Sequence, residues 1–305
     1  MIWMFVTLGL MLGLIAVYLV SWSGDIGRKL ENMLNGFMPA VLLTVGACAC
    51  LSKGSVNLAL PGIACMSAFL GSLLLNADSN LAFAAVIVGL FAGALSGVFA
   101  GLFTIQSGKR VLAVTALSSL LIGTLLMWIP QAANVYSLQT SGSIMRGTVT
   151  AFSVITLLLA AAAAILSGLG RHAPMNTGDS APRPNGGARF LWSVIAGALA
   201  GLAGVLLTLR ISYFQPSNFS GYNESTIIPG MLIAGALIPN LRRSAGEGIC
   251  GGLAALFGGV SCFLLTQILY FTGMDTGVAR VLLMVVSVLF LIPNLLIGKR
   301  KNSLL

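Results

Sequence analysis

The chain has 305 residues, of which 57% are hydrophobic and only 8% are charged. A soluble globular domain carries roughly 25% charged residues, so a soluble protein of this length could not cover so much apolar surface. The net charge of +9 does not indicate nucleic acid binding, because the basic residues lie singly or in small clusters between apolar runs, where they would set membrane topology.

Apolar runs long enough to cross a bilayer as helices, about 20 residues each, follow one another along the chain. They predict an all-α integral membrane protein of about ten transmembrane helices, at residues 2–21, 33–51, 56–75, 81–105, 111–130, 148–169, 190–209, 225–239, 248–271 and 278–298. The first run has no basic segment before it and no A-x-A cleavage site, so we interpret it as a retained helix. Pro61 and Gly62 interrupt the third run and Pro229 and Gly230 the eighth, which predicts two discontinuous spans.

The distribution of Lys and Arg predicts the orientation. Ten spans put both termini on one side, and placing the tail in the cytoplasm puts eleven of the sixteen basic residues inside. These eleven are Lys53, Lys109, Arg110, Arg171, Arg183, Arg189, Arg242, Arg243, Lys299, Arg300 and Lys301; Arg28, Lys29, Arg146, Arg210 and Arg280 fall outside. Tryptophans near the span ends, Trp3, Trp22, Trp128 and Trp192, are interpreted as interfacial anchors.

A polar stretch divides the chain into two halves. We expect one transmembrane domain over residues 1–305, with a first half at 1–170, a flexible cytoplasmic linker at 171–189 and a second half at 190–305. The sequence AGALSG at 92–97 in the fourth span recurs as AGALAG at 196–201 in the seventh. An offset of three spans reverses the direction through the bilayer, so the pair indicates an inverted-topology repeat. Two unrelated small-residue helices are the alternative.

The expected spans contain no group of residues that is typical of an active site. The chain has one histidine, His172 in the linker, and seven carboxylates, which we place in or near loops. No phosphate-binding loop of the Walker type occurs, and the five cysteines lie in apolar runs without metal-site spacing. We therefore expect no catalytic residues, no metal site and no cofactor, and energy supplied by another chain. The lack of central ionisable groups disfavours a proton-driven carrier.

Two segments carry a family resemblance. Residues 32–75, with the connection KGSVNLALPG at 53–62, resemble the corresponding segment of ABC importer permeases of the ribose, nucleoside and branched-chain amino acid type. Ala59 and Pro61 depart from the nucleoside-type form. Residues 196–258 are similar to the family's small-residue helix, followed by Ser212, Gln215 with Pro216, Gly221 with Tyr222, an apolar span, a cytoplasmic turn and a glycine-rich helix. The long linker and the lack of a Gly-Gly pair in the turn depart from the family pattern.

The resemblance implies a division of labour between subunits. The chain would pair with a second permease subunit, identical or homologous, and work with two copies of an ATP-binding subunit and an extracytoplasmic solute-binding protein. The location would be the inner or plasma membrane, with several passes and both termini in the cytoplasm. The cargo would be a small polar solute such as a nucleoside or monosaccharide.

Two sets of residues are candidates for function. For the solute path we select Asn57, Gln215, Tyr222 and Glu224, beside the expected helix breaks; helix capping by Asn57 and structural roles of Gln215 and Tyr222 in an outer loop are alternatives. For coupling to the ATPase we select Asn240, Arg242, Arg243 and Glu247 in the turn after the eighth span; a purely topological role of the two arginines is the alternative.

Other functions remain open at this stage. Within the family, a permease for branched-chain amino acids is the second choice. Outside it, a sodium-driven secondary carrier would work as a single chain without an ATPase, since backbone carbonyls alone can bind sodium. A membrane enzyme or assembly factor is disfavoured, because the spans carry no polar constellation.

Overall fold

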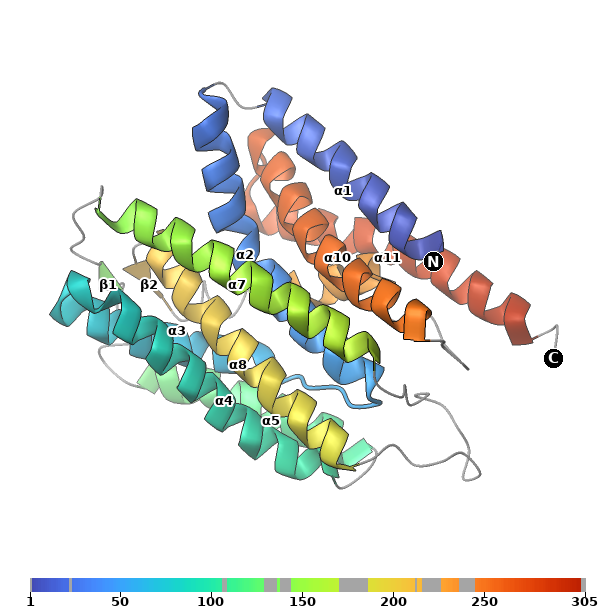
Figure 1. Ribbon diagram of the computed structural model, residues 1–305, viewed down its shortest axis with the longest axis horizontal. Coiled ribbons are helices and arrows are strands. Elements are labelled where there is room, and N and C mark those ends of the chain that lie inside the picture. Colours follow the sequence, from blue (N-terminus) through green and yellow to red (C-terminus); the bar gives the residue numbers. More distant parts are fainter. Residues whose placement is uncertain are drawn as a thin grey trace.

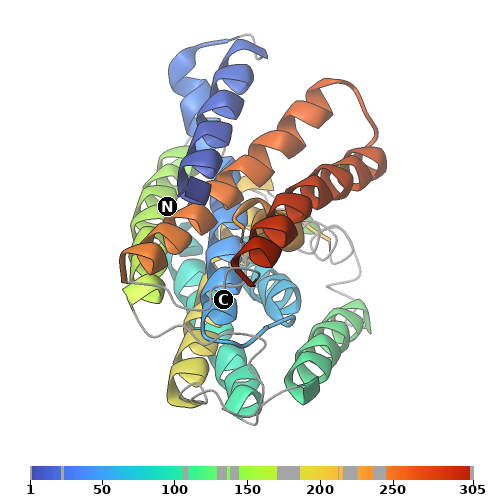
Figure 2. The same cartoon turned by 90° about the vertical axis from the view of Figure 1, so that its right-hand side faces the viewer.

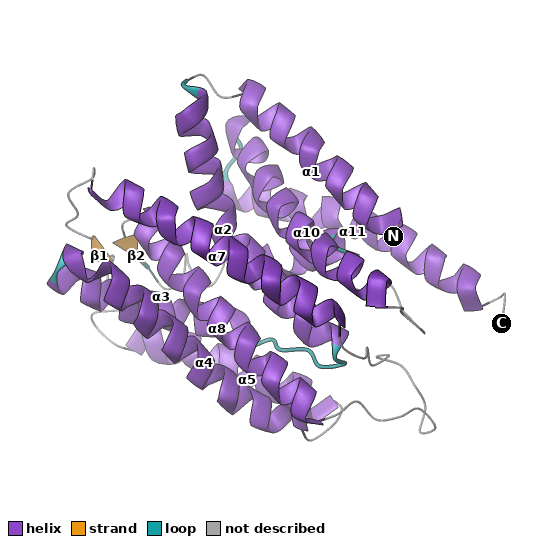
Figure 3. Ribbon diagram, viewed as in Figure 1, coloured by secondary structure: helices purple, strands orange, loops and turns teal. Residues whose placement is uncertain are grey.

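The computed structural model describes residues 2–21, 24–105, 109–128, 136–137, 144–169, 186–211, 213–215, 226–235 and 245–302. Within these ranges the chain is almost entirely helical (Figure 1; Figure 3). The helices are α1 Ile2–Ser21, α2 Ile26–Ser52, α3 Leu60–Ala77, η1 Ser79–Leu81, α4 Ala82–Ile105, α5 Lys109–Trp128, α7 Ile144–Leu169, α8 Gly186–Ile211, α10 Ala245–Phe271 and α11 Thr276–Asn302, and residues 226–233 are also helical. Two strands, β1 Tyr136–Ser137 and β2 Tyr213–Phe214, pair antiparallel.

Seven helices of the described residues are long and apolar enough to cross a membrane, at Trp3–Ser21, Ile26–Ser52, Leu60–Ala77, Ala82–Leu102, Gly147–Leu169, Gly186–Ile211 and Gly248–Phe271. Two shorter apolar helices lie at Val114–Leu126 and Gly277–Phe290. The chain is thus a multi-pass helical membrane protein, as the composition predicts. The number ten stays a prediction, because the eighth predicted span is described as helical only over residues 226–233.

The helices differ in how deeply they lie in the bundle. In α2, 83% of the best spanning window is buried, against 11% in α1, so α2 is central and α1 peripheral. The central helix packs against α7, α8 and α10. On α4, the exposed side chains Phe83, Phe91, Leu95 and Phe99 recur at helical spacing. Such a surface suits lipid and not water.

Helix directions alternate, and this defines two ends of the bundle. One end carries β1 and β2, the start of α2 and the start of α7; we call it the strand end. The other end carries residues 53–59, the starts of α1, α8 and α10, and the end of α11 (Figure 1; Figure 2); we call it the termini end.

Three details of the sequence prediction need correction. Pro61 does not break the third span, because α3 begins at Leu60 and Pro61 lies in its first turn, where a missing N–H costs nothing. Pro229 and Gly230 do not interrupt the helix at 226–233 either; the backbone turns at Gly235, whose φ is +70°. The second helix begins at Ile26, before the predicted residue 33, and therefore includes Glu31.

Pro39 lies inside α2 and is tolerated there at a cost. Proline has no N–H, so the carbonyl of Asn35, four residues earlier, loses the donor that a regular helix would supply. Membrane helices accept such a defect when neighbouring groups compensate for it. The turn from Asn35 to Pro39 is therefore a weak point in the most buried helix of the bundle.

Candidate functional site

The repeated small-residue sequences lie against each other. In α4 and α8, Gly93 and Gly97 face Gly197 and Gly201 so closely that no side chain fits between the helices. A Cβ on Gly93 would lie 2.8 Å from the Cα of Gly201, and a Cβ on Gly197 would lie 2.7 Å from the Cα of Gly97. The numbering on the two helices runs in opposite directions along this contact, so the helices are antiparallel.

A lysine is buried at the termini end. Lys53 follows α2 as its C-cap and is only 4% exposed. Its Nζ donates to the carbonyl oxygen of Ser167 at 2.9 Å and lies 5.9 Å from the centre of the Trp192 ring. Ser167 is in the last turn of α7, where carbonyls have no helical partner and the helix dipole is negative. The ammonium thus caps α7, with no ion pair to a carboxylate of the described residues, while burial lowers the pKa of Lys53.

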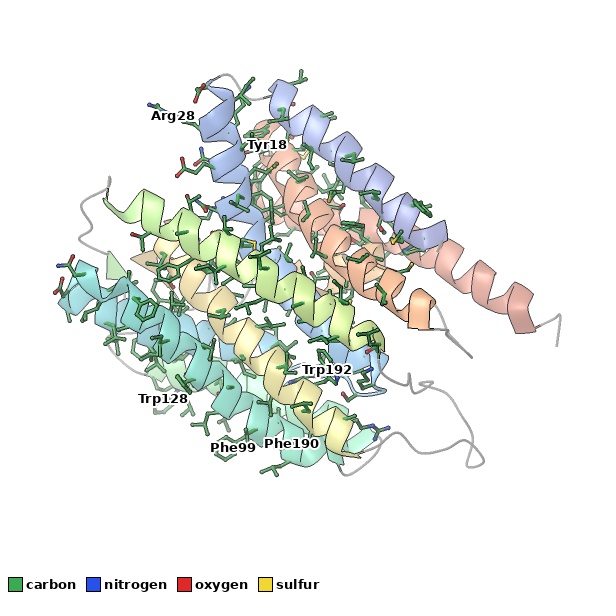
Figure 4. All side chains as sticks on the ribbon, in the orientation of Figure 1. Tyr18, Arg28, Phe99, Trp128, Phe190 and Trp192 are labelled. Atoms are coloured by element: carbon green, nitrogen blue, oxygen red, sulfur yellow. The ribbon has the colours of Figure 1, made fainter. Side chains whose placement is uncertain are left out.

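The predicted linker ends earlier than residue 189. Arg189 lies in the first turn of α8, and its Nε donates to the carbonyl oxygen of Lys53 at 3.3 Å. This contact caps the C-terminus of α2 in the same way as Lys53 caps α7. Trp192 is 8% exposed and lies beside this cluster, so its predicted role as an interfacial anchor is wrong, whereas Trp128, labelled in Figure 4, is 83% exposed.

Asn57 ties the connection between α2 and α3 to α8. Its Oδ1 accepts from the backbone N–H of Ala59 at 3.0 Å, and its Nδ2 donates to Oγ of Ser193 at 3.3 Å. The side chain is buried and satisfied on both sides. Asn57 is not the helix cap of the capping alternative, because Ala59 is the N-cap residue of α3 and no side chain caps that helix. The bond from Asn57 to the N–H two residues later is an Asx turn that precedes α3.

The two described residues of the predicted solute path lie at opposite ends of the bundle. Asn57 contacts α8 near its start at Ser193, whereas Gln215 follows β2 beyond the end of α8 at Ile211. At 1.5 Å per residue, Ser193 and Ile211 are about 27 Å apart along the helix axis. One small solute could meet these two side chains only in succession.

Several predicted site residues lie outside the described ranges. These are Tyr222 and Glu224 of the solute path, and Asn240, Arg242 and Arg243 of the coupling turn. Glu247 is in the first turn of α10, at the termini end.

The strand end holds a polar network that the sequence analysis missed. Oγ1 of Thr150 on α7 donates to Oε1 of Glu31 at 2.9 Å and accepts from Nδ2 of Asn35 at 3.1 Å. Glu31 and Asn35 are four residues apart on α2, so they share one face of the helix. That spacing is visible in the sequence, but the partner on α7 is not.

An arginine lies near the same end. The guanidinium of Arg210, in the last turn of α8, lies 5.2 Å from the centre of the Phe263 ring on α10. A cation over an aromatic face is stabilised by the ring quadrupole. No three His, Cys, Asp or Glu side chains among the described residues are placed to hold a metal ion, and all five cysteines are free.

Comparison of the chain with protein-family models, with curated proteins and with solved structures finds no match.

Proposed function

We propose that the chain is the membrane-spanning permease subunit of an ABC importer for a small polar solute. The sequence resemblance over residues 32–75 and 196–258 suggests this class. A separate ATP-binding subunit would drive the transport, working with a second permease subunit and an extracytoplasmic binding protein.

The contact between α4 and α8 is the observation that carries the proposal. The same short sequence, AGALSG in one helix and AGALAG in the other, forms both sides of an antiparallel crossing. Equivalent residues meet around one point, as expected when two halves with inverted topology are related by a two-fold axis in the membrane plane. Unrelated small-residue helices would pack closely without bringing matching positions together.

Charge supports an orientation with the termini end in the cytoplasm. Basic residues at this end are Lys53, Lys109, Arg110, Arg189, Lys299, Arg300 and Lys301. At the strand end, the basic residues are Arg28, Lys29, Arg146, Arg210 and Arg280. An excess of Lys and Arg marks the cytoplasmic side of membrane proteins.

Single-cysteine labelling tests this orientation. In a cysteine-free background, Ser180→Cys and Ser303→Cys should be protected from a membrane-impermeant thiol reagent in intact cells, and Thr276→Cys should react. Reaction of Ser180→Cys from outside the cell would overturn the orientation.

The coupling role of Glu247 depends on the same orientation. Its place in the first turn of α10 puts it at the proposed cytoplasmic end of the bundle, on the side where the ATP-binding subunit would dock. Reversing its charge adds repulsion and removes attraction at such an interface. Glu247→Lys should lower co-purification of the ATP-binding subunit and solute-stimulated ATP hydrolysis, compared with Asp179→Lys in the linker. Equal, small effects of both changes would leave Arg242 and Arg243 with a topological role only.

Reconstitution separates the proposed function from its rivals. In liposomes, the chain alone should not accumulate adenosine, D-ribose or L-leucine, and uptake should need the ATP-binding subunit and ATP. Uptake of L-leucine alone among the three would indicate the branched-chain amino acid type. Sodium-gradient-driven uptake by the chain alone would replace the proposal with a secondary carrier.

A further inference from the structure

Two buried polar atoms on facing helices have no hydrogen-bond partner in the described part of the chain. They are Oδ1 of Asn35 on α2 and Oγ of Ser153 on α7, and Ser153 is only 1% exposed. Buried polar groups are nearly always hydrogen-bonded, so each exception calls for an explanation. In a membrane, where no bulk water can compensate, the cost of such an exception is higher still.

The register of α2 and α7 brings these two residues to neighbouring turns. The helices run parallel, because Asn35 contacts Thr150 near one end and Lys53 contacts Ser167 near the other. Ser153 is three residues after Thr150 and therefore lies on the same face of α7, one turn deeper in the bundle. On α2 the corresponding turn runs from Asn35 to Pro39.

This turn of α2 offers more than one acceptor. The side-chain Oδ1 of Asn35 has no donor, and its backbone carbonyl loses the helical donor at Pro39. The Glu31 carboxylate accepts from Thr150 on α7, and Nδ2 of Asn35 donates to the same hydroxyl, so this stretch of α2 meets α7 through polar side chains. We call Glu31, Asn35, Thr150 and Ser153 the polar seam.

The polar seam reaches the surface at the strand end. Glu31 is half-buried and its neighbour Asn32 is exposed, whereas Ser153, one turn further along α7 than Thr150, is buried. Three further buried hydroxyls have no partner among the described residues, those of Thr44 on α2, Ser67 on α3 and Ser261 on α10. A row that begins at the surface and ends at unpaired atoms is suited to admit water or solute when the helices part.

We propose that the polar seam opens to water from the strand end and forms part of the solute path. Its acceptors favour a solute that presents hydrogen-bond donors and is uncharged or positive, and the Glu31 carboxylate disfavours anions. This inference deepens the proposed function and rests on it, because the polar seam can be a transport path only if the chain is a permease. The proposed solute path then lies at the interface of α2 and α7, and not at Asn57 in the connection between α2 and α3.

Thiol accessibility tests the opening directly, without a known solute. The full-length chain, with its five cysteines replaced, receives S153C or the matched S261C, which replaces an equally buried and unpartnered serine on α10. Each variant in nanodiscs is treated with a cationic trimethylammonium thiosulfonate or an anionic sulfonate thiosulfonate. S153C should react with the cationic reagent roughly tenfold faster than with the anionic one, because of the nearby carboxylate. S261C should react with neither.

A second change tests the selectivity. Adding E31Q to S153C should abolish the charge preference while the cysteine stays accessible. N35C serves as a second probe if S153C does not give a monodisperse gel-filtration peak.

The proposal fails if the seam cysteines react as slowly as S261C, or if the anionic reagent reacts as fast as the cationic one in the presence of Glu31. Because labelling needs no ATPase, its result is separate from the transport assay. Rapid labelling without ATP-dependent uptake would refute the proposed function and leave an aqueous opening of the seam.

Discussion

Two helix pairs in this bundle are held together by different chemistry. At the centre of the contact between α4 and α8, Gly93 and Gly97 meet Gly197 and Gly201, and backbone meets backbone with no room for a side chain. Towards the two ends of the contact, Gly89 meets the side chain of Val205 and Gly101 that of Phe190. Along α2 and α7 the contacts include polar side chains at both ends, Glu31 and Asn35 with Thr150 at one and Lys53 with Ser167 at the other. Both pairs lie in the same bundle, so the bilayer does not explain the difference.

The difference has consequences for motion. Close glycine packing gains dispersion energy over a long line and has one good arrangement, so parting the helices loses many contacts at once. A hydrogen bond between side chains can exchange its partner for water at little net cost. We therefore expect α4 and α8 to move as one unit, and α2 and α7 to separate when the molecule changes shape.

The largest effect should come from filling the glycine contact. Gly93→Ala puts a methyl group against the backbone of α8 and should lower the free energy of unfolding by about 3 kcal/mol, at the upper end for overpacking. Gly147→Ala on α7 is the matched control, because an added Cβ there meets nothing within 4 Å. It should leave stability unchanged or raise it by up to about 1 kcal/mol through helix propensity. Unfolding by SDS in mixed micelles measures both, and equal effects would show that α4 and α8 tolerate separation.

This contact illustrates what the sequence can predict. The two six-residue segments share their small residues, and close helix packing in membranes requires small residues, so a pattern in the sequence corresponds directly to a contact. Helix positions follow for the same reason: a run of apolar residues is both the cause of the span and its signature.

The polar contacts between helices could not be predicted from the sequence. Lys53 lies between two apolar runs and resembles any topology-setting charge, and only the folded chain brings the C-terminus of α7 to its ammonium group. The polar sequence around Arg189 indicates a linker, but Arg189 lies on α8. Pro61 indicates a break in a linear pattern, yet it lies in the first turn of α3, where proline is compatible with a helix. Pro229 lies within the helical residues 226–233 without interrupting them. In each case a distant partner, or the position within a helix, decides the role.

Removing the buried ammonium should have the second largest effect. Lys53→Met leaves the Ser167 carbonyl and the end of α7 without their cationic cap, and should cost about 2 kcal/mol of stability. Lys29→Met is the matched control. Its Nζ also donates to a helix-end carbonyl, that of Leu19 at 2.8 Å, but the side chain is only half-buried. The control should lose less than about 1 kcal/mol in the same SDS titration. Equal losses of stability for Lys53→Met and Lys29→Met would refute the importance of burial at Lys53.

Cutting the hydrogen bonds of the polar seam should cost less. Thr150→Val removes the hydroxyl that joins Glu31 to Asn35 and should lower stability by about 1–2 kcal/mol, because both partners lose a bond. Thr156→Val on the same helix is the control, since its hydroxyl bonds, among the described residues, to two carbonyls of its own helix, those of Phe152 and Ser153. A larger loss at Thr156 would argue against a specific contact between α2 and α7.

The smallest change in stability should follow from Ser153→Ala, and its sign is the informative part. The Ser153 hydroxyl is buried without a partner, so its removal should leave the free energy of unfolding unchanged or raise it by up to about 1 kcal/mol. Ser193→Ala removes a buried hydroxyl that does have a partner, Nδ2 of Asn57, and should lower stability by about 1 kcal/mol. If Ser→Ala raises the free energy of unfolding at position 153 and lowers it at position 193, the Ser153 hydroxyl does not stabilise the packed state. Its role would then belong to another state, in which α2 and α7 have separated. A loss at Ser153 equal to that at Ser193 would mean that the packed state already satisfies this hydroxyl, for example through a trapped water molecule. The interface of α2 and α7 would then be as fixed as that of α4 and α8.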